Sequence, residues 1–146
     1  MRTPALRPLT GNVPGYTQTL ALRPESAALA RRSVRTTLAC WGLESLADDA
    51  ELIASELVTN AVEHARPQRA SDEDPGRCRL TLERPDDATV WLTVADSSPR
   101  NLVRRSPTTD DDTGRGLTLV EAVSSRWTAQ RSRAGKVVWA ELRVTA

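Results

Sequence analysis

The stretch Glu56–His64, ELVTNAVEH, carries two helical patterns at once. It lies within Leu46–Arg66, where apolar residues recur at helical spacing: Leu46, Ala50, Ile53, Leu57, Val58, Ala61, Val62 and Ala65. Glu56, Asn60 and His64 follow one another at intervals of four residues, so they share one face of the same helix. Because buried polar groups cost free energy unless they find partners, this polar line indicates either a ligand site or a solvated face.

Length and composition favour one soluble intracellular domain. The chain has 146 residues and a formal net charge of +1, so bulk charge gives no reason to expect nucleic acid or a membrane surface as partner. Cys40 and Cys78 lack metal-ligand spacing and suit reduced thiols, and a single histidine excludes a histidine-rich metal site. No apolar run approaches the roughly 20 residues of a membrane span, and the N-terminus lacks the apolar segment of a signal peptide. We therefore expect a cytoplasmic protein.

The order of expected elements predicts the fold class. Residues 1–15 hold three prolines and no periodicity and are expected to form a flexible arm, with the domain at 16–146. The expected elements are a strand at Tyr16–Leu22, a helix from Pro24 to Cys40 before Gly42, a helix opened by a capping box of Ser45 and Asp48, strands at Cys78–Glu83 and Thr89–Ala95, a helix at Gly116–Trp127, and two strands around Ala134-Gly135. This order predicts an α/β two-layer sandwich, with a mixed, mostly antiparallel sheet and helices on one face.

Asp96 ends the apolar strand and is followed by Ser97 and Ser98. A carboxylate at such a position can accept a hydrogen bond from a ligand amine, such as the exocyclic amino group of adenine. It can equally close the strand with a local turn. On its own, the residue leaves both interpretations open.

The segment Thr113–Val120, TGRGLTLV, places two glycines before a helical pattern. Glycines allow backbone amides to approach an anion, and a helix N-terminus favours negative charge. The alternative is that the two glycines only end the loop before the helix and bind nothing. The pattern is no dinucleotide fingerprint, and Lys136 is followed by Val137, which excludes a phosphate-binding P-loop. A phosphate here would need a metal ion, backbone amides or arginine to neutralise it.

Together, the segments ELVTNAVEHA, VADSSP, TGRGLTLVEAVSSRW and GKVVWAEL resemble the nucleotide-binding boxes of the superfamily that includes gyrase and the histidine kinases. More closely, they resemble the small anti-sigma factor serine/threonine kinases. The resemblance covers about Leu22 to Val144 in the right order. It implies the Bergerat ATP-binding fold, with ATP and Mg²⁺ as cofactors.

The resemblance also implies roles for individual residues. Glu56 would be the general base that polarises the attacking hydroxyl, Asn60 would coordinate Mg²⁺ that bridges the ATP phosphates, and Asp96 would bind the adenine amino group. His64 would serve packing or capping rather than chemistry, and Arg104–Thr113 would form a mobile lid. The remaining nucleotide-binding residues implied are Gly114, Arg115, Gly116, Leu117 and Thr118.

Three positions depart from the pattern of that family. Ser98 replaces a glycine at the adenine site, and Val137 replaces a threonine that helps hold adenine. Asp110–Asp112 stand where kinase members carry a lid arginine, and like charge repels a γ-phosphate unless Mg²⁺ or ordering intervenes.

Two functional classes follow from the resemblance. One is an enzyme that phosphorylates a serine of an anti-anti-sigma factor and captures a sigma factor. The other is a nucleotide-binding module without catalysis that acts only by sequestering a protein partner. A detached histidine-kinase domain is a third interpretation, but the only histidine, His64, lies inside the nucleotide box. Under each of these interpretations, we expect neither nucleic acid nor a membrane as a direct partner, and a homodimer is allowed.

Overall fold

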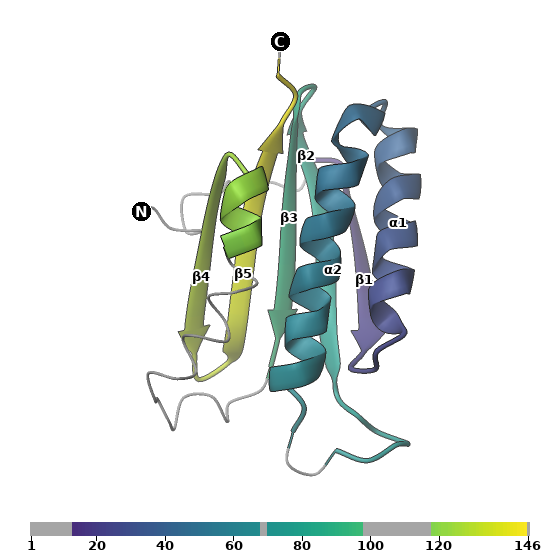
Figure 1. The fold of residues 1–146 in the computed structure, drawn as a ribbon, viewed down its shortest axis with the longest axis vertical. Helices are drawn as coiled ribbons and strands as arrows, with labels where there is room; N and C mark the ends of the chain where they lie inside the picture. Colours follow the sequence, from purple (N-terminus) through teal and green to yellow (C-terminus); the bar gives the residue numbers. More distant parts are fainter. Residues whose placement is uncertain (1–12, 68–69, 98–117, 146) are drawn as a thin grey trace.

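Helices cover one face of a five-stranded sheet (Figure 1). The computed structural model describes residues 13–67, 70–97 and 118–145. The elements in chain order are β1 (Gly15–Ala21), α1 (Ser26–Cys40), the short 3-10 helix η2 (Glu44–Leu46), α2 (Ala47–His64), β2 (Arg77–Asp86), β3 (Thr89–Asp96), β4 (Arg126–Ser132) and β5 (Gly135–Arg143). A further helical turn spans residues 118–123. The expected fold class and element order are confirmed, with β1 one residue earlier than expected at each end.

The strands run in the order β1-β2-β3-β5-β4, and each neighbouring pair is antiparallel. The sheet in the described residues is therefore antiparallel rather than mixed. β1 and β4 form its two edges. Since β3 and β5 lie at adjacent positions although β4 separates them in sequence, the C-terminal hairpin brings its second strand into the middle of the sheet.

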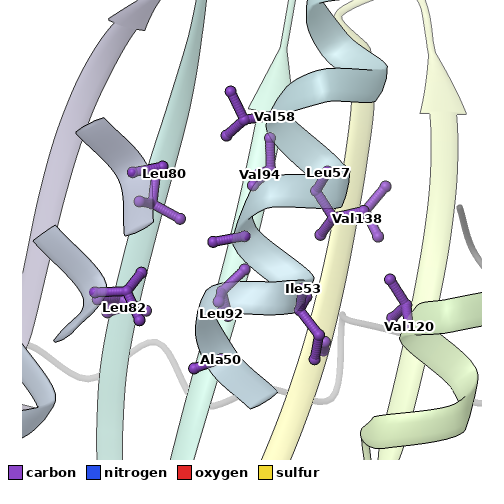
Figure 2. Close-up of a cluster of buried hydrophobic side chains, with 14 of the residues drawn as sticks. Ala50, Ile53, Leu57, Val58, Leu80, Leu82, Leu92, Val94, Val120 and Val138 are labelled. Carbon is purple, nitrogen blue, oxygen red and sulfur yellow. The ribbon is translucent and has the colours of Figure 1, made fainter. Parts of the chain in front are cut away.

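Alternation along the central strands builds the core. Leu80 and Leu82 of β2 and Leu92 and Val94 of β3 point toward the helices and are buried. They meet the apolar stripe of α2, which Figure 2 shows lying over Leu92 and Val94, with Leu80 and Leu82 to the side of the helix. The stripe expected from the helical spacing is confirmed, because its members are buried, with Val62 partly so: Leu46, Ala50, Ile53, Leu57, Val58, Ala61 and Ala65. No helix in the described part of the chain is long and apolar enough to cross a membrane.

The expected capping box at the start of α2 is wrong. The N-cap residue is Leu46, which makes no side-chain cap, and Ser45 lies in the preceding 3-10 helix. The Leu46 amide instead donates to the Leu43 carbonyl at 3.0 Å, and the buried Leu46 side chain anchors the turn. Asp48 forms an ion pair with Arg35 of α1 at 2.8 Å. Tertiary contacts between the two helices thus replace the local cap.

The helix expected at Gly116–Trp127 is wrong at its C-terminal end. The described helical turn ends at residue 123, and Trp127 belongs to β4. The Ser124 hydroxyl donates back to the Val120 carbonyl at 2.7 Å, and the Ser125 amide donates to the Glu141 carbonyl at 2.7 Å. Trp127 still packs against the core. Its apolar side chain therefore matched the helical spacing of the preceding residues, although the backbone at this position is extended.

A buried carboxylate lies on the sheet face opposite the helices. Glu141 of β5 is only 2% exposed, and Trp91 and Arg126 flank it in the two adjacent strands. Its oxygens accept hydrogen bonds from Trp91 Nε1, Ser125 Oγ, Arg126 and Arg143 at 2.9–3.2 Å. Burial alone would raise the pKa of Glu141, but these donors reverse that effect and hold the pKa at about 2.

We expect Glu141→Gln to destabilise the fold by about 3 kcal/mol at pH 7, since it leaves two arginines and an indole without their acceptor charge. A depressed native pKa contributes stability that is fully present above the unfolded value and lost as pH falls from about 4.5 toward about 2. The difference in unfolding free energy between wild type and variant should therefore shrink over that range. Urea unfolding at pH 7 and pH 3 measures it, and a difference that does not change with pH contradicts the account.

Candidate functional site

A row of polar and ionisable side chains crosses the helix-covered face of the sheet at one end. Asp96, the last residue of β3, lies opposite Cys78 of β2 on one side and Lys136 of β5 on the other. Lys136 in turn lies opposite Arg131 of β4. Directly opposed residues of an antiparallel ladder point to the same face, so the row faces α2 together with Val94.

The C-terminal half of α2 covers this row and encloses a pocket. The pocket is small and partly open to solvent. Its lining is apolar except for four polar side chains, Asn60 and His64 from the helix and Asp96 and Lys136 from the strands. The apolar remainder consists of Leu57, Ala61, Ala65, Val94 and Val138. Such a mixture suits a flat apolar ring that carries a few polar groups.

Asn60 has unused hydrogen-bonding capacity. Its side-chain amide nitrogen is buried and has no hydrogen-bond partner among the described residues. Because leaving a buried polar group unpaired costs about 1–3 kcal/mol, native proteins rarely tolerate one unless it serves another purpose. The carboxamide also offers an oxygen, a ligand that Mg²⁺ accepts, and rotation about its last bond exchanges the two atoms. Asn60 therefore fits a ligand or metal at this position.

Burial and charge at the row shift two ionisable groups. Burial, and secondarily the charge of Asp96, raises the pKa of the Cys78 thiol to about 11, so that this cysteine stays a neutral, packed thiol. Burial and Arg131 lower the pKa of Lys136, and the Asp96 carboxylate partly offsets them. The row thus has cationic groups on one side of Asp96 and a neutral one on the other.

Gly135 holds the end of β3 in place. It begins β5 after the β4–β5 turn and adopts a positive φ of 127°. A Cβ atom there would collide with the Asp96 carbonyl oxygen and would lie 2.7 Å from the Ser97 Cα. The β4–β5 turn therefore contacts the backbone of Asp96 directly. Only glycine allows the two backbone segments to come so close.

The structure brings together some of the expected site residues and not others. Asn60 and Asp96 line one pocket, whereas Glu56, one helical turn earlier on α2, is half-buried and outside the lining. Thr118 lies in the helical segment described at 118–123. The expected phosphate-binding residues Gly114–Leu117, the lid Arg104–Thr113, and Ser98 lie outside the described residues.

Sequence reasoning overlooked part of the site. None of Lys136, Cys78 and Arg131 was predicted to belong to the site. Lys136 was used only to exclude a P-loop, and no pattern in the sequence placed Cys78 or Arg131 near Asp96. The one available signal was the apolar alternation of the strands, which puts Lys136 on the same face as Val138. Strand order, which brings β5 next to β3, could not be read from that alternation.

The fold and the pocket together define a class of protein. An antiparallel sheet covered on one face by helices, with a pocket between one helix and the sheet, is the architecture of the Bergerat-type ATPase fold. Residues 20–142 match the histidine kinase-like ATPase domain, and the chain belongs to that family. A comparison with curated proteins found no match.

Proposed function

We propose that the protein binds Mg·ATP in the pocket beneath α2 and uses it to regulate a sigma factor through an antagonist protein. The observation that carries this proposal is the convergence of Asn60 and Asp96 on one largely apolar pocket in a chain of the histidine kinase-like ATPase family. These two residues lie 36 positions apart in sequence, on a helix and on a strand end.

The pocket offers separate partners for the base and for the metal. The Asp96 carboxylate would accept a hydrogen bond from the adenine amino group, while Leu57 and Val138 would contact the ring. The Asn60 carboxamide would hold Mg²⁺, which when bound neutralises phosphate charge. The remaining phosphate contacts would come from Gly114–Gly116.

The replacement of threonine by Val137 takes no contact from this pocket. Strand alternation turns Val137 away from α2, and the lining contains its neighbours Lys136 and Val138 instead. The replacement of the family's threonine at this position is therefore compatible with adenine binding.

The position of Glu56 on α2 suits a catalytic role. Glu56 lies one turn before Asn60 on the same helix face and has access to solvent. From there it would accept the proton of an attacking serine hydroxyl as that oxygen bonds to the γ-phosphorus and ADP departs. The resemblance to anti-sigma factor kinases suggests a serine of an anti-anti-sigma factor as the acceptor, with a sigma factor as the captured partner.

The alternative function is partner capture without catalysis. Asp110–Asp112 favour it, because they stand where kinase members of the family carry a lid arginine. Incubation of the full chain with radiolabelled ATP and a candidate anti-anti-sigma factor distinguishes the two functions. Label on a serine of the antagonist supports the kinase, whereas nucleotide binding and sigma-factor capture without label support the module.

We expect Mg·ATP to raise the melting temperature by several degrees, since a ligand at about 100 times its Kd stabilises the native state by about 2.7 kcal/mol. Asn60→Ala should abolish the Mg²⁺ dependence of this shift, and Asp96→Asn should remove most of the preference for ATP over GTP. Asp49→Asn, at the opposite end of α2, is the matched control and should behave as wild type. Equal small shifts with ATP, GTP and buffer would argue against the site.

A further inference from the structure

In the part of the chain that the structure describes, β1 is an edge strand that lacks the usual protection against pairing. Its sequence, GYTQTLA, contains neither a charged residue nor a proline, and its ladder with β2 is regular over all seven residues. Among the described strands, β2 is its only neighbour. Proteins normally protect an exposed edge with charges, prolines or bulges, because unpaired backbone groups can pair with another chain.

The opposite edge differs. β4 carries Arg126 and Arg131 within its seven residues. Charged side chains of this kind discourage an added strand. Among the described strands, the sheet therefore has one edge with charged residues and one without them.

The backbone groups that β1 offers can be identified. Arg84 N–H donates to the Pro14 carbonyl and Leu22 N–H donates to the Gly76 carbonyl, each at 2.9 Å. In an antiparallel ladder, hydrogen-bonded pairs recur at every second residue, so the even-numbered residues of β1 bond to β2. The amides and carbonyls of Gly15, Thr17 and Thr19 consequently point to the free edge.

A groove rich in hydrogen-bond donors runs beside this edge. It lies between β1 and the outer flank of α1 and is lined by Tyr16, Arg32, Ser33, Thr36 and Thr37. Each of these side chains can donate a hydrogen bond, and none carries a negative charge. The groove is thus suited to an anionic group.

Arg32 is the cation that this groove leaves available. Its neighbours on α1 point to α2: Arg31 donates to Ser55 Oγ at 2.9 Å, and Arg35 pairs with Asp48 and Glu51. Arg32 is exposed and forms no hydrogen bond or ion pair with any described residue.

We propose that β1 and this groove bind an extended segment of a partner protein, which adds a strand to the sheet and places an acidic side chain against Arg32. Backbone pairing supplies affinity in this mode, and side-chain contacts supply specificity. Charge complementarity favours an acidic partner over a second copy, since a symmetric pairing of two β1 strands would bring two Arg32 side chains toward each other. The nucleotide pocket involves α2, β3 and β5, so both sites can be occupied at once.

Fluorescence anisotropy of the full chain with labelled seven-residue peptides tests this proposal. The probes alternate valine and threonine, with glutamate, glutamine or lysine at the centre. The glutamate peptide should bind best, Arg32→Gln should weaken its binding about threefold, and Arg32→Glu should reverse the preference toward lysine. Arg31→Gln, on the same helix but bonded to Ser55, is the matched control and should leave binding unchanged.

Backbone pairing is tested separately. Thr19→Pro removes one edge amide without touching the ladder to β2 and should abolish binding, whereas Thr19→Ala should retain it. Equal binding by the proline and alanine variants would overturn strand addition, as would failure of every peptide to bind. Self-association that Thr19→Pro abolishes would instead assign the edge to a second copy and overturn the acidic partner.

Discussion

Replacing Glu56 with alanine should leave Mg·ATP bound and lower phosphoryl transfer to the antagonist serine about 10²–10⁴-fold, the usual cost of losing a general base. Glu56 lies outside the pocket lining that contains Asn60 and Asp96, so its removal should leave the proposed contacts to the base and to Mg²⁺ intact. Transfer of label from ATP and the thermal shift with Mg·ATP, measured on the same preparation, separate chemistry from binding.

Glu63→Ala is the control for that variant. Glu63 is also on α2 but is exposed and close to His64, with 3.7 Å between its Oε1 and the imidazole Nε2. Its loss should leave the transfer rate unchanged. If Glu56→Ala transfers label as fast as wild type, Glu56 is not the base.

Gly135→Ala should both destabilise the fold and damage the pocket. The added methyl group would meet the Asp96 carbonyl oxygen, and the positive φ disfavours any side chain. Backbone cannot give way as a flexible side chain can, so we expect a loss of about 3 kcal/mol or more. Displacement of Asp96 should also weaken ATP binding at temperatures where the variant stays folded.

A Gly42→Ala variant separates the effect of the positive φ from the effect of the collision with Asp96. Gly42 too has a positive φ, 73°, but a Cβ there would meet nothing within 4 Å. Gly42→Ala should therefore cost only about 1 kcal/mol of backbone strain and leave ATP binding intact. Denaturant unfolding of both variants gives the comparison, and equal losses would show that the contact between Gly135 and Asp96 is unimportant.

The parts of the fold with strong periodicity were predictable from sequence. The apolar stripe of α2 and the alternation in β2 and β3 correspond directly to buried positions, because burial on one face imposes a period on the sequence. Element ends were less predictable, because tertiary contacts decide them. Asp48 bonds to Arg35 rather than capping its own helix, and Trp127 reaches the core from a strand.

The candidate site divides in the same way. Asn60 and Asp96 stood out as polar residues at the margins of apolar elements, and the structure places them around one pocket. Lys136 could not be assigned to that pocket from sequence, since its position depends on β5 lying next to β3. Gly135 read as an ordinary turn residue, and its contact with Asp96 becomes evident only when the hairpin closes against β3.

Isothermal titration of the full chain with ATP, in Mg²⁺ and in EDTA, tests the central claim most directly. The account predicts one ATP site per chain that requires Mg²⁺, prefers ATP to GTP, and loses that preference in Asp96→Asn. ATP that does not bind, or that binds wild type and Asp96→Asn with the same preference over GTP, would contradict the placement of the nucleotide between α2 and the end of β3.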